Sequence, residues 1–403
     1  MDRQKEYKSE NKMKDCLAYF HLSPVWEKVL KGFREKYISY GRFGGKVILK
    51  NLKPTDITCI DPCMGSGHIL IAMFDVLMDI YESAGYDKRE AAFEIVEHNI
   101  HGLDIDQRAY QLAFFAVMMK GRGYNRRFLR GRDGKPEPKV YAIVESNEIN
   151  RNHLQFFGTH LSEMERNLAV MQIEGLLDTF KDAREYGSIL NVDVCDWDVL
   201  EKFVDDLGTT GQISFESVGS EETQKQLRKL VRVAKNLGLK YDVVVTNPPY
   251  MGASGMGTNL AKYVKDKYPK SKADLFSVFI ERGNKMLKKH AYNCMVTMQS
   301  WMFLSSFEEL RKELLENITV VNLMHMENMV MGIAFGTAVS LFKNSSISRY
   351  RGFYHSVKLC NVHKDRVRNI PIKENNNNCI ENEKFERIPT MPIAYWVSDE
   401  LIH

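Results

Sequence analysis

The sequence predicts an α/β fold in which a doubly wound, mostly parallel sheet of seven strands carries additional helices. Short apolar runs and longer amphipathic segments alternate from residue 56 onward, which is typical of parallel strands joined by crossover helices. The run Tyr241–Thr246 is rich in β-branched residues, as expected of a strand buried on both faces. A glycine-containing turn at Asp61–His68 separates the first strand from the first long helix, and ligands bind at such turns in these sheets.

The elements follow in order from the spacing of the apolar residues. Strands are expected at Thr58–Asp61, Ile100–Leu103, Val140–Val144, Tyr241–Thr246, Asn293–Thr297, Val320–His325 and Thr337–Phe342. Helices are expected at Ile69–Ser83, Glu90–His98 and Gln107–Lys120, and near residues 155–183 and 221–238.

This pattern divides the chain into three regions. Residues 1–50 are expected to form a helical segment. Their apolar residues at helical spacing are Phe20, Trp26, Leu30 and Phe33. Residues 51–345 form the α/β domain, which a helical insertion interrupts at about 121–240. Residues 346–403 form a C-terminal extension without periodicity, in which the run Asn375–Asn378 indicates a flexible, low-complexity tract.

Composition excludes several classes of protein. The chain has 403 residues, of which 44% are hydrophobic and 27% charged, an ordinary globular balance. Its net charge of +4 suits one local basic face but does not establish nucleic-acid binding. The 7 cysteines are scattered without a CxxC pair, so we expect no metal site, no disulfides and a reduced, cytoplasmic protein. No apolar run approaches the ~18 residues of a membrane span, and the polar N-terminus resembles no signal peptide.

The turn at Asp61–His68 has the chemistry of a cofactor loop. Gly65 and Gly67 allow a sharp turn and the close approach of a ligand. The start of the following helix favours a carboxylate, whereas Asp61 favours a cation. S-adenosylmethionine carries both groups, while a nicotinamide cofactor would require a third glycine and a phosphate loop would end in GK[ST]. The expected cofactor-binding residues here are Asp61, Pro62, Cys63, Gly65, Ser66 and Gly67.

A second acidic position follows the next strand. Asp104 comes directly after an apolar run, and an acid at a strand end can accept hydrogen bonds from two ribose hydroxyls. Asp104 follows Asp61 by many more residues than the roughly 20 that separate the glycine turn from the acid in dinucleotide-binding folds. Asp106 is expected to cap the following helix.

The tetrad Asn247-Pro248-Pro249-Tyr250 directly follows the strand Tyr241–Thr246. An exocyclic amino nitrogen is a weak nucleophile because its lone pair is delocalised. Two hydrogen-bond acceptors, the Asn247 side-chain oxygen and the Pro248 carbonyl, can localise that lone pair, and the two proline rings fix their direction. The tetrad thus provides orientation and preorganised electrostatics without a strong general base. Tyr250 offers a ring face on which an extruded base can stack.

With these motifs, the chain resembles the N6-adenine DNA methyltransferases. The order of cofactor loop and tetrad matches the gamma type, in which a target-recognition region follows. The similarity is closer still to the PglX methyltransferases of BREX antiphage systems and covers most of residues 50–400. The stretches that carry it are Asp61–Arg127, Tyr241–Ser306 and Ile388–Ser398.

The resemblance implies a Rossmann-like methyltransferase fold that uses S-adenosylmethionine and acts on double-stranded DNA with a flipped adenine. It implies other proteins of a defence system as partners and no membrane. It also implies a reversed last strand at Thr337–Phe342, a segment beginning at Asp274 beside the cofactor adenine, and an aromatic wall for the target base near Phe335.

The chain departs from this family in two places. The family has an aromatic, Thr-Pro-containing cofactor segment before the turn, and residues 1–50 contain no good copy of it. A large C-terminal target-recognition region is also absent. The expectation is a shortened member that binds cofactor weakly and methylates little DNA alone, and a low-micromolar dissociation constant by titration calorimetry would contradict it.

Several alternatives stay open at this stage. The contact with the cofactor adenine is expected from Asp193 or Asp196, at the end of the third strand. Arginines at 122–132 and lysines at 262–272 are either phosphate contacts or solvated side chains. The methyl acceptor could instead be a protein glutamine, as in release-factor methyltransferases with the same tetrad, or RNA. A non-catalytic DNA-binding defence subunit is the alternative outside enzymes.

Overall fold

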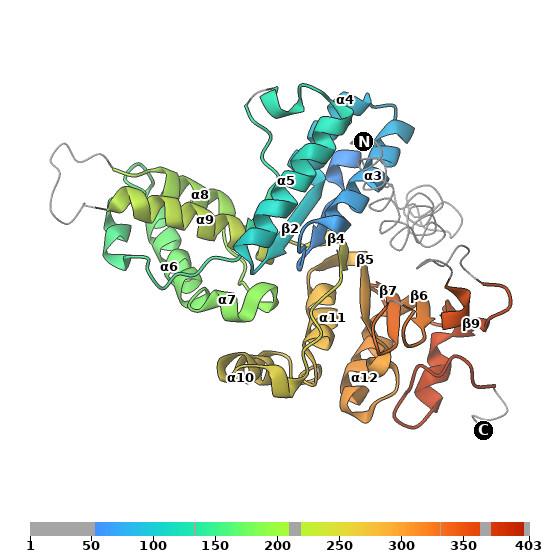
Figure 1. The fold of residues 1–403 in the computed structure, drawn as a ribbon. Coiled ribbons are helices and arrows are strands. Elements are labelled where there is room, and N and C mark those ends of the chain that lie inside the picture. Colours follow the sequence, from blue (N-terminus) through green and yellow to red (C-terminus); the bar gives the residue numbers. More distant parts are fainter. Residues whose placement is uncertain (1–52, 133, 209–218, 331, 363–371, 399–403) are drawn as a thin grey trace, which may run out of the picture.

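The computed structural model describes residues 53–132, 134–208, 219–330, 332–362 and 372–398. The helical segment expected at 1–50 lies outside these ranges. A central sheet runs through the molecule in the strand order β3-β2-β1-β4-β5-β7-β6-β8-β9 (Figure 1). The strands are β1 (Cys59–Asp61), β2 (Ile100–Asp104), β3 (Lys139–Ala142), β4 (Tyr241–Thr246), β5 (Leu287–Met298), β6 (Thr319–Met326), β7 (Thr337–Lys343), β8 (Arg351–Val357) and β9 (Asn377–Glu381).

The first seven strands confirm the prediction. Strands β3, β2, β1, β4 and β5 are parallel to one another. Strand β7 is antiparallel to both β5 and β6, so it is the reversed strand expected at Thr337–Phe342. Strand β5 begins earlier than the sequence predicts, at Leu287.

The predicted total of seven strands is wrong, because the extension adds β8 and β9. Strand β8 pairs parallel with β6, and β9 pairs antiparallel with β8. The asparagine run is therefore part of an ordered edge rather than a flexible tract. Its amides bond to backbone carbonyls: Asn375 Nδ2 donates to Ser356 O over 2.8 Å, and Asn378 Nδ2 donates to Tyr395 O over 3.1 Å. An edge strand pairs through its backbone and requires no alternation of apolar residues. The residue pattern of this segment therefore did not indicate strand β9.

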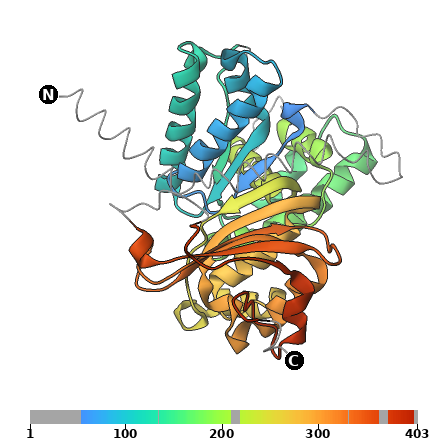
Figure 2. The same cartoon turned by 90° about the vertical axis from the view of Figure 1, so that its right-hand side faces the viewer.

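Helices cover both faces of the sheet. One face carries α3 (His68–Ser83), α4 (Lys88–Glu94) and α5 (Gln107–Tyr124). The other face carries the insertion helices α6 (Glu163–Thr179), α8 (Trp197–Asp205) and α9 (Ser220–Gly238), together with α11 (Leu275–Lys285) and α12 (Glu308–Asn317). The short helices α7 (Ala183–Tyr186) and α10 (Thr258–Lys267) contact each other. Figure 2 shows the blue and teal helices on one side of the strands and the orange ones on the other. The arrangement is the doubly wound α/β fold that the sequence predicts.

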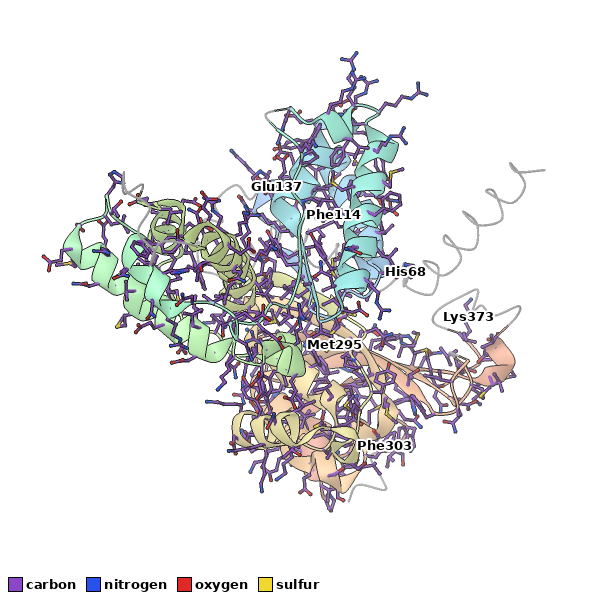
Figure 3. The ribbon with its side chains drawn as sticks, turned by 60° about the vertical axis from the view of Figure 1, so that its left-hand side comes forward. His68, Phe114, Glu137, Met295, Phe303 and Lys373 are labelled. Atoms are coloured by element: carbon purple, nitrogen blue, oxygen red, sulfur yellow. The ribbon has the colours of Figure 1, made fainter. Side chains whose placement is uncertain are left out.

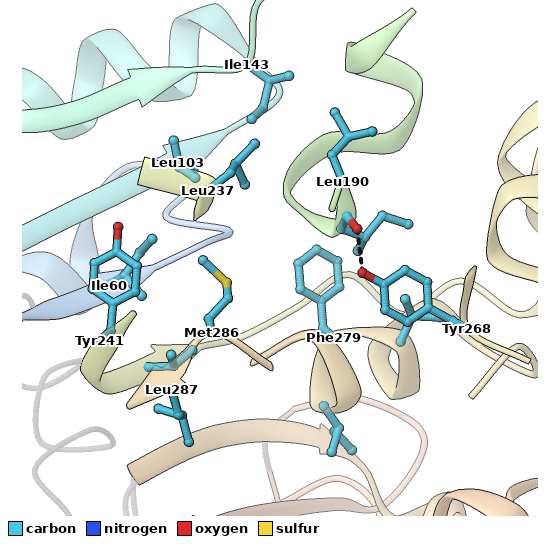
Figure 4. Close-up of a cluster of buried hydrophobic side chains, with 14 of the residues drawn as sticks. Ile60, Leu103, Ile143, Leu190, Leu237, Tyr241, Tyr268, Phe279, Met286 and Leu287 are labelled. Carbon is cyan, nitrogen blue, oxygen red and sulfur yellow. Dashed lines mark hydrogen bonds between the residues drawn. The ribbon is translucent and has the colours of Figure 1, made fainter. Parts of the chain in front are cut away.

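The core explains why β4 is buried on both faces. Val244 packs in the cluster under the insertion helices, whereas Val243 and Val245 pack under α3 to α5. Figure 4 shows the first cluster, in which the fully buried Tyr241 lies among side chains of β1, β2 and α9. In the same view the Tyr268 hydroxyl donates to the carbonyl of Ile189 over 2.5 Å.

Side chains also set the starts of the helices. Asp106 accepts a hydrogen bond from Arg108 N over 2.7 Å at the start of α5, which confirms its predicted capping role. Ser162 and Glu165 form a reciprocal capping box on α6. Within the described ranges, no helix combines the length and apolar character that a membrane span requires.

Candidate cofactor and catalytic site

The cofactor loop and the tetrad meet at the carboxyl ends of two neighbouring strands. Strands β1 and β4 pair in parallel, so Asp61 and Thr246, their last residues, lie side by side. The Thr246 hydroxyl donates to Asp61 Oδ1 over 2.6 Å. Since Asn247 follows Thr246, the buried acid of the turn lies next to the start of the tetrad.

Asp61 is fully buried, and only one of its two carboxylate oxygens has hydrogen-bond partners. Its Oδ1 accepts hydrogen bonds from Thr246 and from Cys63 N at 3.0 Å. Its Oδ2 is buried and has no hydrogen-bond partner. The pKa of Asp61 is raised to about 7, mainly because the carboxyl is buried; the hydrogen bonds from Thr246 and Cys63 oppose the rise, and the nearby Asp104 adds to it. A buried carboxylate oxygen without a partner is costly, so a cationic group placed here would be stabilising.

The glycine turn has the geometry that its residues require. Gly65 and Gly67 have φ of 51° and 87°, values that favour glycine. A Cβ on Gly67 would lie 3.0 Å from the Cα of Ala113 in α5. Helix α3 begins next, at His68, without a capping side chain, so its first amide groups can receive a carboxylate. Figure 3 labels His68 at the end of the helix layer that faces Met295 of β5.

Asp104 connects β2 to this turn. Its Oδ2 accepts from Gly65 N, and its Oδ1 accepts from Asp106 N, both over 2.9 Å. The acid predicted from sequence therefore contacts the cofactor loop, while each oxygen retains a lone pair for a further donor. Among the remaining turn residues, Pro62 is buried, whereas Cys63 and Ser66 are half-buried.

The hydroxyl group of Tyr250 contacts the first residue of the tetrad. The Tyr250 hydroxyl lies 3.0 Å from Asn247 Oδ1 and 3.2 Å from the carbonyl of Val296. The Tyr250 ring centroid lies 5.7 Å from that of Phe335, at an interplanar angle of 74°. Burial raises the pKa of Tyr250 to about 12, so the hydroxyl stays protonated and can donate. Asn247 and Pro249 are exposed, and Pro248 is buried.

The segment beginning at Asp274 lies beside the tetrad. The Asp274 carboxylate accepts from Met251 N at 3.0 Å and from Phe276 N at 3.2 Å, so it caps α11 and fixes the chain after Tyr250. The ring centroid of Phe276 lies 6.2 Å from that of Tyr250. The role expected of Asp274 beside the cofactor adenine stays a prediction.

The placement of Asp193 at the end of the third strand was predicted wrongly, whereas the contact of Asp193 or Asp196 with the cofactor adenine stays a prediction. The third strand of the sheet is β3, which ends at Ala142, whereas Asp193 is exposed in irregular chain before α8. Asp196 caps α8 by accepting from Val199 N over 3.1 Å. The intervening Val194 is 94% exposed, so this short apolar run is not a buried strand.

Sequence reasoning missed the residues that connect the insertion to the cofactor loop. Ser188 Oγ donates to the carbonyl of Pro62 over 2.6 Å. The guanidinium of Arg282, on α11, donates from Nε to the Ser188 carbonyl at 3.2 Å and from a terminal nitrogen to Leu237 O at 2.9 Å. Nothing in the local pattern indicates Ser188 or Arg282. Thr246 could have been found as the last residue of a strand beside Asp61.

The two basic segments differ in position. Helix α5 runs away from the cofactor loop, and its 18 residues span about 27 Å, so the arginines beyond residue 121 lie at its far end (Figure 1). Arg132 there pairs with Glu94 and Glu97 at 2.7 and 2.8 Å. Lys262, Lys265 and Lys267 are exposed on α10, which follows the tetrad. No group of three or more potential metal ligands occurs in the described part of the chain.

Comparisons of the sequence with known proteins identify the family. A model described as "Eco57I restriction-modification methylase" matches residues 98–330. The chain is 36% identical over 361 residues to adenine-specific methyltransferase PglX of Lacticaseibacillus casei (strain Zhang), a match that covers 87% of this chain and 29% of that protein. It is 34% identical over 371 residues to adenine-specific methyltransferase BrxX of Escherichia coli O9:H4 (strain HS), which covers 86% and 30%. A DrdV–DNA complex matches with 12% identity and a TM-score of 0.48, over 93% of this chain and 30% of that one.

The chain spans less than a third of the length of these two relatives. The family model nevertheless matches more than half of the residues of this chain. The matched range includes Asp104, the tetrad and strand β6. The chain therefore belongs to the Eco57I restriction-modification methylase family.

Proposed function

We propose that this chain is the catalytic part of a DNA methyltransferase that transfers a methyl group from S-adenosylmethionine to N6 of adenine. The observation that carries the proposal is the 2.6 Å hydrogen bond between Thr246 and Asp61. Because Thr246 directly precedes Asn247, this bond supports a methyl-donor site at Asp61 next to an acceptor site at the tetrad. Membership of the methylase family and the adenine-specific relatives support the same reaction.

The residues of the turn fit S-adenosylmethionine. The partnerless Asp61 Oδ2 suits the ammonium group of the methionine moiety, and the uncapped start of α3 suits its carboxylate. Asp104 can accept hydrogen bonds from the ribose hydroxyls. The cofactor supplies an electrophilic methyl group on a sulfonium. Nicotinamide dinucleotides fit less well, because their pyrophosphate would face the buried Asp61 carboxylate.

The tetrad suits an adenine amino group. Asn247 Oδ1 and the Pro248 carbonyl can accept one hydrogen each from N6, which localises the nitrogen lone pair. Tyr250 and Phe335, 5.7 Å apart, offer aromatic surface for the extruded base. Asn247 is exposed while Pro248 is buried, so the side chain faces the solvent from which DNA approaches. No ionisable base is needed, since the proton can leave after methylation.

The direct test is a tritium-transfer assay with labelled S-adenosylmethionine. Purified chain is incubated with unmethylated genomic DNA, with bulk RNA and with a release-factor peptide containing the glutamine motif. Incorporation into DNA alone supports the proposal. Incorporation into the peptide or the RNA, with none into DNA, would assign the tetrad to the alternative acceptors.

The biological setting is proposed from the relatives. The chain resembles the PglX methyltransferases of BREX antiphage systems, and a relative that is 36% identical carries the name PglX. We therefore propose a phage-defence role with other defence proteins as partners. Cytoplasmic action fits the six described cysteines, all of which are free thiols. Replacing the chromosomal gene by an Asn247→Ala allele and measuring phage plating tests this role, which an unchanged plating efficiency would contradict.

A further inference from the structure

The segment that follows the tetrad is a loop whose two ends are joined beside the tetrad. It leaves the sheet after β4 and returns at the start of α11. The Met251 carbonyl accepts a hydrogen bond from Leu275 N over 2.9 Å, and Ala253 N donates to the Ala273 carbonyl over 3.1 Å. Residues 254–272, which we call the lysine loop, therefore begin and end next to the proposed catalytic residues.

The lysine loop is strongly basic. It contains five lysines and one acidic residue, Asp266, so its formal charge of +4 equals that of the entire chain. The five exposed lysines are Lys262, Lys265, Lys267, Lys270 and Lys272. Among the described residues only Lys270 has an acidic partner, Glu313, at 3.2 Å. The other four positive charges are available to an anionic partner.

Helix α10, within this loop, places two of the lysines on one face. Leu260 and Val264 are buried and define the inner side of the helix. With 3.6 residues per turn, Lys262 and Lys265 lie on the opposite side. Because they are three residues apart, they are neighbours on that outer face.

Contacts with the insertion hold α10 in place. The Tyr263 hydroxyl accepts a hydrogen bond from Asn191 N over 3.1 Å. Asn259 Nδ2 donates to Glu185 Oε2 over 2.9 Å. The backbone that carries the lysines is therefore already ordered, so binding an anionic partner does not require the helix to form.

We propose that the lysine loop binds the phosphate backbone of double-stranded DNA beside the target adenine, with Lys262 and Lys265 as the contacts on α10. The inference deepens the proposed function and rests on it, because it assumes that DNA reaches the tetrad. Phosphate contacts fix a protein on DNA without reading the sequence, and the flexible ammonium group of lysine suits that role. An acidic protein surface is the competing partner. The attachment of both loop ends beside the tetrad favours the substrate of that site.

The arginines at 122–132 provide a comparison within the same chain. They are also five in number, and Arg126 and Arg127 are exposed. Figure 1 shows the end of α5 that leads to them beside α4 at the top of the view, and α10 near α11 at the bottom. The two segments therefore match in charge and differ in their position relative to the tetrad.

The salt dependence of DNA binding measures the phosphate contacts. The logarithm of the binding constant falls linearly with the logarithm of the salt concentration, with a slope of about 0.9 for each neutralised phosphate. The probe is a fluorescently labelled DNA duplex of arbitrary sequence, titrated by anisotropy between about 50 and 200 mM salt. The double variant Lys262→Gln, Lys265→Gln should reduce the slope by about two. The double variant Arg126→Gln, Arg127→Gln should leave it unchanged.

A conservative variant and steady-state kinetics separate DNA binding from other effects. Lys262→Arg with Lys265→Arg should retain the slope, because the charges are kept. The glutamine variant of the lysines should raise KM for DNA and leave kcat unchanged, since backbone contacts are made equally before and during methyl transfer. Its thermal unfolding should match that of the unsubstituted chain, because both lysines are exposed.

The outcomes distinguish this inference from the proposed function. An unchanged slope in the glutamine variant of the lysines, or a reduced slope in that of the arginines, would overturn the inference. Methylation of DNA by the same proteins would then leave the proposed function standing. An unsubstituted chain that neither binds the duplex nor methylates DNA would overturn both.

Discussion

The hydroxyl group of Tyr250 lies 3.0 Å from Oδ1 of Asn247, so the tetrad orients its own acceptor. The proline rings between them fix the backbone, and the hydrogen bond fixes the amide plane. When adenine N6 donates to the same oxygen, the second lone pair of Oδ1 is still available for the tyrosine. The tyrosine therefore has two separable roles, which are to orient Asn247 and to stack on the base.

Tyr250→Phe separates these roles. The phenyl ring keeps its contacts with Phe335 and Phe276, whereas the hydrogen bond to Asn247 is lost. A net hydrogen bond contributes about 1 kcal/mol, so we expect kcat to fall about fivefold with DNA affinity unchanged. Single-turnover kinetics and an equilibrium binding assay measure the two quantities. Tyr250→Ala should additionally weaken DNA binding, and equal effects of both variants on affinity would contradict a stacking role.

The pKa of Asp61 predicts how cofactor affinity depends on pH. Burial raises this pKa to about 7 in the free protein, while an ammonium group binds the carboxylate form. Below pH 7 binding must displace a proton, so affinity should fall about tenfold for each further unit of pH. Above pH 7 the dependence should flatten as Asp61 becomes fully ionised, until the cofactor's own α-ammonium group begins to lose its proton near pH 8. Titration calorimetry between pH 5.5 and 8.5 measures this, and two buffers of different ionisation enthalpy reveal the proton released.

Asp61→Asn should abolish that pH dependence and weaken binding at pH 8. Asp106→Asn is the matched control, because Asp106 lies near the turn, and asparagine caps a helix as well as aspartate does. The same raised pKa affects stability in the absence of cofactor. Protonated Asp61 favours the folded state, so its contribution is lost as pH rises through 7. A pH-independent affinity for the unsubstituted chain would show that Asp61 does not face the cation.

Alanine substitutions at Gly67 and Gly85 together test how closely the cofactor turn approaches α5. Their φ values are 87° and 86°, but only at Gly67 would a Cβ meet another residue, at 3.0 Å from the Cα of Ala113. Both alanine variants carry the cost of a positive φ, about 1–2 kcal/mol. Gly67→Ala should be less stable than Gly85→Ala by a further 1–3 kcal/mol, roughly the cost of overpacking. Urea unfolding of both variants measures the difference, and equal stabilities would contradict the close approach.

Arg311 should anchor the segment 388–397. It is fully buried and donates to the carbonyl of Thr390, within that segment, and to the carbonyl of Trp301. Arg311→Met leaves these carbonyls without donors, and we expect a loss of about 3 kcal/mol in the free energy of unfolding. Cleavage by trypsin after Arg387 should accelerate as well. Lys312→Met is the control, since Lys312 is the exposed neighbour. Equal protease resistance of both variants would show that the segment is held by other contacts.

The sequence predicted the parts of the fold that depend on local patterns. The strand Tyr241–Thr246 was placed to the residue, because a β-branched run followed by two prolines has a sharp end. The glycine turn and its acid were equally well defined, since Gly65 and Gly67 serve a conformation that few other residues adopt.

Other features depend on contacts between distant residues and gave no local signal. Strand β9 pairs through its backbone and carries asparagines, which are depleted in strands. The short run around Val194 resembled a strand, but Val194 itself is almost fully exposed. Ser188 contacts the loop at Pro62 over a separation of 126 residues, and such a contact follows only from the arrangement of the insertion against the sheet.

The central claim is that the tetrad methylates N6 of adenine, and mass spectrometry of digested DNA tests it most directly. Unmethylated DNA is incubated with S-adenosylmethionine and either the unsubstituted chain or Asn247→Ala, whose cofactor affinity is checked in parallel. N6-methyldeoxyadenosine should accumulate slowly with the unsubstituted chain, which is expected to methylate little DNA alone, and remain at background with the variant. Methylation at another base or atom, or equal N6-methyldeoxyadenosine from both proteins, would contradict the account.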